Sequence, residues 1–110
     1  MPELPEVETT RRGIAPHIVG QRIRTVDIRQ PKLRWPITVG VEVATKGRKV
    51  QAVERRGKYL LIKFNNGTLI SHLGMSGSLR VTNMEETPSF HDHFDLVFTN
   101  DTCLRYRDPR

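Results

Sequence analysis

Apolar residues near the start of the chain recur with the period of a helix. The apolar residues that share one side of a helical wheel are Leu4, Val7, Ile14 and Ile18. An adjacent polar stripe contains Glu3, Glu6 and Thr10. This spacing predicts an N-terminal helix with one apolar face. Gly13 and Pro16 predict that the helix ends or kinks there, with a short second turn reaching Ile18.

From Arg22 onward the apolar pattern changes to the alternation that is typical of strands. The predicted strands are residues 22–29, 49–56, 58–64, 68–73, 78–82, 92–98 and 102–107. Asn65-Asn66-Gly67 is a strong hairpin signal, and Thr99-Asn100-Asp101 predicts a second tight turn. NMEETPS at 83–89 is the one stretch that looks like a loop insertion.

The segment KYLLIKF at 58–64 has apolar residues on both of its faces. Such a strand is expected at the centre of a sheet, covered on both sides. The elements together predict a mostly β (α+β) fold, namely a two-layer antiparallel β-sandwich with the N-terminal α-helix packed against it. A chain of 110 residues suits one domain, residues 1–110.

Composition indicates in which compartment the protein is expected and which bound groups it can hold. No apolar run approaches the length of a membrane span, and the charged start does not resemble a signal peptide. Cys103 is the only cysteine, so the chain alone can build neither an internal disulfide nor a four-cysteine zinc site. We therefore expect a soluble protein of a reducing, cytoplasmic compartment, with no metal and no membrane partner.

Positive charge is concentrated in one part of the chain. The net charge is +6 and the pI is about 10.1. Between Thr9 and Thr82, fifteen Lys and Arg face only three acidic residues, which is a local net charge of +12. Clustered basic charge of this kind favours binding to a polyanion such as DNA. Solubilising surface charge is the alternative interpretation.

The N-terminal sequence MPELPEVE raises a chemical possibility. Removal of Met1 would leave Pro2 with a free secondary amine, which titrates near ~8 rather than the ~10.4 of lysine. Such an amine can attack a sugar C1′ and form an iminium ion directly. The alternative is that the prolines stiffen the chain end and that the glutamates favour the positive end of the helix.

Three internal motifs are candidate binding sites. In HLGMSG at 72–77, Met75 lies in a small polar turn, where it could project as a wedge between bases or fold back as core filler. VERRGKYL places Arg55, Arg56 and Lys58 around Gly57, which suits phosphate contact or a solvated strand edge.

The third motif is HDHFDLVF, in which strand alternation puts His91, His93 and Asp95 on one face. These three residues could bind a metal ion. Imidazoles that bind phosphate or neighbouring backbone are the preferred interpretation, because no fourth ligand is evident.

The segments MPELPEVE, RRGKYLL, SHLGMSGSLR, HDHFDLVF and LRYRDPR occur in this order along the whole chain. In this order and spacing they resemble the N-terminal domain of the bacterial formamidopyrimidine-DNA glycosylases. The resemblance implies a base-excision repair enzyme, a DNA glycosylase and lyase. It would remove oxidised purines such as 8-oxoguanine and formamidopyrimidines, then cleave the abasic strand by β,δ-elimination.

The resemblance also implies roles for individual residues. Pro2 would be the nucleophile, Glu3 the general acid and base at the sugar, and Glu6 a supporting residue. Lys58, counted with the catalytic set, would hold phosphates flanking the lesion. The implied DNA-binding residues are His72, Met75, His91, Arg110, Arg55 and Arg56. Met75 and Arg110 would fill the gap left by the flipped nucleotide, with Arg110 facing the orphaned base.

The family pattern continues beyond this sequence into Arg-Phe-Gly, a helix-two-turn-helix region and a four-cysteine zinc finger that carries one zinc ion. We therefore expect this chain to be an isolated or truncated N-terminal domain, with no cofactor of its own and weak or no base excision. The expected partner is double-stranded DNA with oxidised purines or abasic sites, bound by a monomer associated with the bacterial nucleoid.

Two other function classes fit parts of the sequence. Small tautomerases also use an N-terminal proline, as a general base, but need no concentrated basic face. A non-catalytic nucleic-acid-binding β-domain would need the basic face but no reactive amine. Covalent trapping on abasic DNA by borohydride separates the second class from a lyase, because only an amine that forms an imine becomes fixed.

Overall fold

The computed structural model of the chain describes residues 4–29, 45–72 and 77–109. Pro2, Glu3, Met75 and Arg110 lie outside the described residues. Within these described ranges, one helix and seven strands follow one another: α1 (Leu4–Ile18), β1 (Ile23–Ile28), β2 (Ala52–Arg56), β3 (Tyr59–Phe64), β4 (Gly67–His72), β5 (Ser78–Asn83), β6 (Asp92–Phe98) and β7 (Thr102–Arg107).

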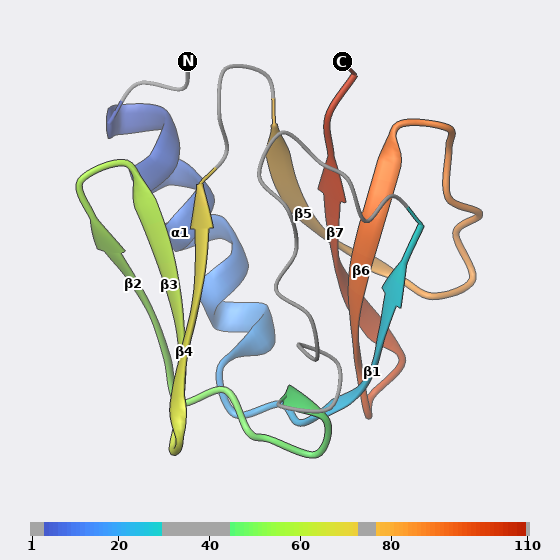
Figure 1. Cartoon of the computed structure of the whole chain (residues 1–110), viewed down its shortest axis with the longest axis horizontal. Helices are drawn as coiled ribbons and strands as arrows, with labels where there is room; N and C mark the ends of the chain where they lie inside the picture. Colours follow the sequence, from blue (N-terminus) through green and yellow to red (C-terminus); the bar gives the residue numbers. More distant parts are fainter. Residues whose placement is uncertain (1–3, 30–44, 73–76, 110) are drawn as a thin grey trace.

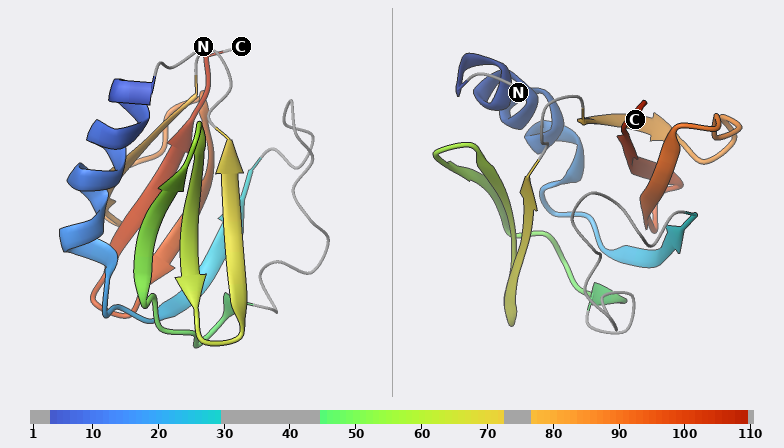
Figure 2. Two further views of the ribbon diagram at one scale, coloured as in Figure 1. Left: turned by 90° about the vertical axis from the view of Figure 1, so that its left-hand side faces the viewer. Right: turned by 45° about the horizontal axis from the view of Figure 1, so that its top comes forward.

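The strands form two antiparallel sheets that face each other (Figures 1 and 2). One sheet has four strands in the order β1-β6-β7-β5, and the other has three in the order β2-β3-β4. Helix α1 packs against β2 and β3 of one sheet and β5 of the other, so it closes one side of the sandwich. The predicted sandwich with a packed N-terminal helix is confirmed.

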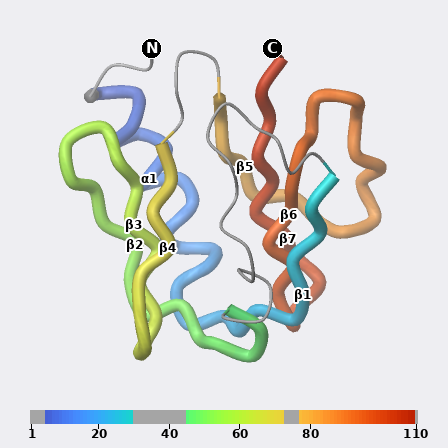
Figure 3. The backbone as a smooth tube through the Cα atoms, in the orientation of Figure 1, coloured from blue at the N-terminus to red at the C-terminus, as the bar shows by residue number. Residues whose placement is uncertain are grey.

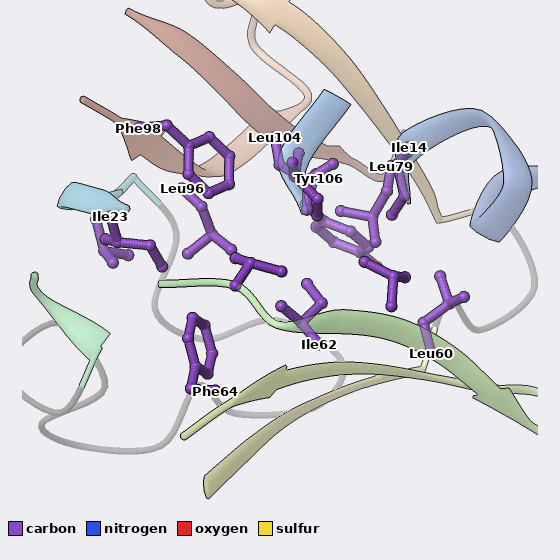
Figure 4. Packing of buried hydrophobic residues seen from close by; sticks show 14 of the residues in the cluster. Ile14, Ile23, Leu60, Ile62, Phe64, Leu79, Leu96, Phe98, Leu104 and Tyr106 are labelled. Carbon is purple, nitrogen blue, oxygen red and sulfur yellow. The ribbon is translucent and has the colours of Figure 1, made fainter. Parts of the chain in front are cut away.

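The core lies between the two sheets. Figure 4 shows Leu60, Ile62 and Phe64 of β3 pointing toward the inner residues of the opposite sheet, which include Leu96, Phe98, Leu104 and Tyr106. The helix adds Val7, Ile14 and Ile18, all at most 3% exposed. Burial of this apolar surface is the main term that stabilises such a fold.

Both predicted turns are confirmed. Phe64 pairs with Gly67, so Asn65 and Asn66 form a two-residue hairpin loop between β3 and β4. In the turn from β6 to β7, Asp101 has a positive φ of 66°. The side-chain Oδ1 of Asn100 accepts hydrogen bonds from the backbone N and the Oγ1 of Thr102.

The expected break in the helix at Gly13 and Pro16 is wrong. Helix α1 runs unbroken from Leu4 to Ile18. Pro16 lies in the last turn on the exposed side and removes one backbone donor from the helix. Burial of Ile14 and Ile18, on either side of Pro16, outweighs the tendency of glycine and proline to end a helix.

The expected burial of the strand at 58–64 on both sides is half right. β3 is the central strand of its sheet, and its inner face is buried. On the outer face, however, Tyr59 is 49% exposed and Ile70 of β4 is 62% exposed. The helix packs across one open side of the sandwich rather than on this outer face, which local composition could not reveal.

The loop predicted at 83–89 connects β5 to β6 (Figure 3). It reaches the outer face of the four-stranded sheet, where the carbonyl oxygen and Oε2 of Glu86 accept hydrogen bonds from Arg105. Arg105 is 1% exposed and also donates to both carboxylate oxygens of Asp95. The buried guanidinium of Arg105 therefore has hydrogen-bond partners, as a charged group in the protein interior requires.

Candidate functional site

Several of the predicted site residues lie at one end of the sandwich, which we call the upper edge. The upper edge is formed by the start of α1, the β2–β3 turn (57–58), the end of β4 at His72, the start of β6 at Asp92 and the end of β7 at Arg107 (Figure 1). The antiparallel pairings Tyr59↔His72 and Asp92↔Arg107 bring these strand ends together within each sheet.

The β2–β3 turn presents two cations at the upper edge. Gly57 has a positive φ of 58°, a conformation that glycine adopts without strain. The side chain of Arg56 is exposed and that of Lys58 is half-buried. A turn built on glycine leaves its backbone accessible beside these charges, and the predicted phosphate contact of this motif stays a prediction.

Arg55, the third cation of this motif, is bonded within the chain. Its Nε donates to Oε1 of Glu8 at 3.1 Å, and its NH1 donates to the carbonyl oxygen of Gly57 at 3.1 Å. The bond to Glu8 joins the first half of α1 to the β2–β3 turn. Arg55 thus fixes the turn that carries Lys58, and its predicted contact with DNA stays a prediction.

Glu8 is an acidic centre that binds three arginines. Oε2 of Glu8 lies 2.6 Å from NH2 of Arg11 and 2.8 Å from Nε of Arg12, and Oε1 binds Arg55. The hydrogen bonds from Arg11, then Arg12, hold the pKa of the Glu8 carboxyl well below its usual range. The carboxylate is therefore ionised at neutral pH, and it ties the helix that follows Pro2 and Glu3 to the basic turn.

His72 lies at the end of β4 and is half-buried. Its ring packs on the ring of Tyr59, with a centroid distance of 5.0 Å and an interplanar angle of 53°. Tyr59 directly follows Lys58, so this cross-strand pair couples the position of His72 to that of the basic turn. The motifs alone did not reveal this contact, which depends on the pairing register between β3 and β4.

Residues 91–95 do not form a metal site. Nε2 of His93 lies 2.7 Å from the carbonyl oxygen of Asp108, and Asp95 binds Arg29 and Arg105. Among the described residues, no group of three or more His, Cys, Asp or Glu could hold a metal ion. The preferred interpretation, an imidazole bonded to neighbouring backbone, is confirmed for His93.

A β-bulge explains why the predicted alternation of side chains fails at the start of β6. Asp92 pairs with Arg107 and Phe94 pairs with Tyr106, so β6 has one residue, His93, more than β7 between these two pairs. His93 is thereby turned to the backbone of Asp108, while His91 remains half-buried at the upper edge. The backbone N of Asp108 also donates to the carbonyl oxygen of His91 at 3.0 Å.

The remaining predicted residues divide into described and undescribed ones. Glu6 is exposed in the first turn of α1. The described chain begins at Leu4 and ends at Pro109, next to Glu3 and Arg110 respectively.

Cys103 is buried in β7, and burial raises the pKa of its thiol, which argues against a reactive nucleophile there. No helix in the described part of the chain is long and apolar enough to cross a membrane.

Comparison with known proteins matches the whole chain to one protein family. A family model described as "Formamidopyrimidine-DNA glycosylase N-terminal domain" matches residues 1–110. The formamidopyrimidine-DNA glycosylase of Methylococcus capsulatus is 61% identical over all 110 residues, which correspond to 41% of that relative. The enzyme of Cellvibrio japonicus is 58% identical, with 40% of its length covered. The chain thus spans about two-fifths of the length of these curated relatives.

Solved structures agree with the sequence comparison. A crystal structure of the Lactococcus lactis formamidopyrimidine DNA glycosylase, non-covalently bound to DNA containing an abasic site, superposes with a TM-score of 0.88 at 36% identity. That match covers 97% of this chain and 41% of the other. A complex of the inhibited Lactococcus lactis enzyme with DNA containing N7-benzyl-Fapy-dG gives a TM-score of 0.90 at 38% identity, covering 99% of this chain and 41% of the other.

Proposed function

We propose that this chain, which belongs to the formamidopyrimidine-DNA glycosylase family, supplies the catalytic N-terminal domain of a base-excision repair enzyme. The enzyme as a whole would remove oxidised purines such as 8-oxoguanine and formamidopyrimidines from duplex DNA, and then cleave the abasic strand by β,δ-elimination. Because the chain spans about two-fifths of its relatives, its own share is the nucleophile and one wall of the DNA cleft.

The chemistry would begin at Pro2 once Met1 is removed. Its secondary amine attacks C1′, the glycosidic bond breaks, and the opened sugar carries an iminium ion. Glu3 would exchange protons at the sugar, and Glu6, exposed in the first turn of the helix, would support that site. The iminium withdraws electrons from the sugar, so that the phosphates on its two sides can leave in turn.

DNA would be held at the upper edge. Lys58, His72 and His91 would bind phosphates flanking the lesion, with Arg56 as a further cation. Met75 would enter the gap left by the flipped nucleotide, and Arg110 would face the orphaned base. For Arg55 we propose an indirect part in DNA binding, because its guanidinium holds the β2–β3 turn through Glu8. We further propose that the enzyme acts as a monomer at the bacterial nucleoid.

The observation that supports this proposal is that three candidate phosphate-binding residues lie at the same end of the sandwich. Lys58 directly precedes β3, His72 ends β4 and His91 directly precedes β6. These strand ends lie at the end of the sandwich where α1 begins (Figure 1). Pro2 and Glu3 directly precede that helix. An enzyme that must hold a phosphate backbone and attack the adjacent sugar needs cations close to its nucleophile.

The test is a chimera in which this chain replaces the matching 110 residues of the Methylococcus capsulatus relative. We expect the chimera to excise 8-oxoguanine opposite cytosine and to leave a cleaved strand. Lys58→Ala and His72→Ala should each slow excision about tenfold or more, as expected for loss of a positioned phosphate contact. Lys63→Ala is the matched control. Nζ of Lys63 forms an ion pair with Oε1 of Glu54 at 3.1 Å, and Lys63 lies away from the upper edge. A chimera that folds but excises no lesion would contradict the proposal.

A further inference from the structure

Phe90 is the most exposed of the large hydrophobic residues in the described part of the chain. Its side chain is 90% exposed, against 62% for Ile70 and 49% for Tyr59. A single exposed apolar side chain is common and carries no meaning by itself. Two further features distinguish Phe90, namely the rigidity of the turn that holds it and the surface to which it belongs.

The turn around Phe90 is closed by hydrogen bonds on both sides. The backbone N and the Oγ of Ser89 donate to Oδ2 of Asp92, at 2.8 and 3.0 Å. The backbone N of Asp92 donates back to the carbonyl oxygen of Ser89 at 3.1 Å. Asp92 is 1% exposed, and its Oδ1 accepts a hydrogen bond from Arg80 at 3.2 Å. Phe90 is thus presented by an ordered turn anchored in the sheet.

The ring of Phe90 lies against His91. The two ring centroids are 5.2 Å apart, with an interplanar angle of 80°, so the rings meet edge to face. The carbonyl oxygen of His91 is in turn bonded to the backbone N of Asp108, beyond the end of β7. The aromatic pair is therefore fixed at the upper edge, beside the segment that leads to Arg110.

The charge of the upper edge indicates what would cover this ring. Arg56 and Arg107 are exposed there and Lys58 is half-buried, so an anionic partner is favoured. Glu86, in the same β5–β6 connection, is neutralised by Arg80 and Arg105. A nucleotide offers an apolar sugar and base within a few ångströms of each phosphate, which matches an aromatic ring set beside a phosphate-binding histidine.

We propose that Phe90 is a DNA-contacting residue whose ring packs on the deoxyribose or base of the nucleotide next to the phosphate bound by His91. This inference rests on the proposed function and adds an apolar contact to a surface otherwise described by its charges. Because the turn is already ordered, binding need not fix a flexible loop first. The contact should strengthen DNA binding without changing its dependence on salt.

The experiment measures binding of the 110-residue chain to a short fluorescein-labelled duplex that contains a tetrahydrofuran abasic analogue. Fluorescence anisotropy is recorded over a series of salt concentrations for the unaltered chain, Phe90→Ala, Phe90→Tyr and Val19→Ala. Val19 is the matched control, because it is 41% exposed and follows the opposite end of α1. Melting temperatures of all four proteins are measured in parallel.

We expect Phe90→Ala to weaken binding about fivefold or more at every salt concentration, with the slope of log K against log salt unchanged. Phe90→Tyr and Val19→Ala should bind like the unaltered chain, and no melting temperature should fall, since an exposed ring leaves no cavity. Unchanged affinity in Phe90→Ala, while the unaltered chain shows salt-dependent binding, would overturn this inference alone. Absence of DNA binding by the unaltered chain would also overturn this inference, whereas excision by the chimera tests the proposed function separately. Weaker binding accompanied by a lower melting temperature would assign Phe90 to the fold and likewise overturn the inference.

Discussion

At the scale of single residues, intramolecular partners decide what each cation of the basic turn can do. Arg55 and Arg56 are neighbours in sequence and point to opposite faces of β2, as strand geometry requires. Arg55 is bonded to Glu8 and to the carbonyl oxygen of Gly57. Arg56 is exposed at the upper edge. Two adjacent arginines with one predicted role thus have different surroundings in the fold.

The first prediction separates these two arginines. Arg56→Ala should reduce the slope of log K against log salt for duplex DNA by about 0.9, the value for one lost phosphate contact, and leave stability unchanged. Arg55→Ala should leave that slope nearly unchanged and lower the free energy of unfolding by up to about 1 kcal/mol, because a partly exposed ion pair is worth little. Salt titrations by anisotropy and urea unfolding measure the two quantities. Equal losses of slope in the two variants would show that both arginines contact phosphate.

The second prediction concerns Glu3 and is made for an enzyme that contains the whole family sequence, such as the chimera described above. Glu3→Gln should reduce excision of 8-oxoguanine far more than cleavage of a preformed abasic site, because departure of the base requires a proton donor. Single-turnover rates on the two substrates give the comparison. A parallel loss of both activities would contradict this division of roles.

At the scale of elements, the start of β6 depends on a buried carboxylate. Burial raises the pKa of Asp92, but hydrogen bonds from Arg80 and Ser89 outweigh that effect and lower it from 3.8 to about 2. The ionised form is therefore stabilised by folding. The resulting stability is fully present above the unfolded-state pKa of 3.8 and is lost as the pH falls through about 2.

The third prediction follows from this linkage. Asp92→Asn should lower the free energy of unfolding by about 2 kcal/mol at neutral pH, the energy of a pKa shift of this size. The difference between the two proteins should shrink as the pH falls from about 4 to about 2, because protonation then removes the same charge from the parent. Urea unfolding at several pH values measures this difference in the free energy of unfolding. A difference that stays constant over this range would show that the charge of Asp92 is not what stabilises the turn.

Most elements could be predicted from the sequence because their signals are local. Alternating apolar residues predicted each strand found in the described part of the chain, and Asn65-Asn66-Gly67 marked its hairpin. Local signals failed where tertiary burial decided the outcome. Helix α1 continues through Gly13 and Pro16 because Ile14 and Ile18 are buried in the core. The outer face of β3 is open because the helix packs elsewhere, a fact of layer arrangement that no short segment encodes.

The candidate site was predictable only in part. The motifs gave Lys58, His72 and His91, which now lie at one edge. The bond between Glu8 and Arg55 joins residues that are 47 positions apart, so no spacing rule could have found it. The bulge at the start of β6, which turns His93 to the backbone of Asp108, likewise depends on the register between two strands.

At the scale of the whole molecule, the chain combines a basic upper edge with about two-fifths of the length of its relatives. The fourth prediction is that residues 1–110 bind duplex DNA weakly, with a Kd of ~10⁻⁴–10⁻⁶ M that rises steeply with salt. Binding should not distinguish 8-oxoguanine from guanine, because flipping costs a few kcal/mol and we propose that the contacts which offset this cost involve parts of the enzyme outside residues 1–110. Competition titrations with the two duplexes measure the ratio. Marked preference for the lesion would show that this chain alone recognises it.

The central claim is that Pro2 is the nucleophile of a lyase, and borohydride trapping on an abasic duplex tests it most directly. Abasic DNA already lacks the base, so imine formation there should survive where base excision by the chain alone does not. We predict that the chain without Met1 becomes covalently fixed to the DNA, with the adduct on its N-terminal peptide by mass spectrometry. The same chain with Met1 retained or an N-terminal tag should bind DNA equally and give no adduct. Equal trapping by the tagged chain, or an adduct on a lysine such as Lys58, would contradict the claim.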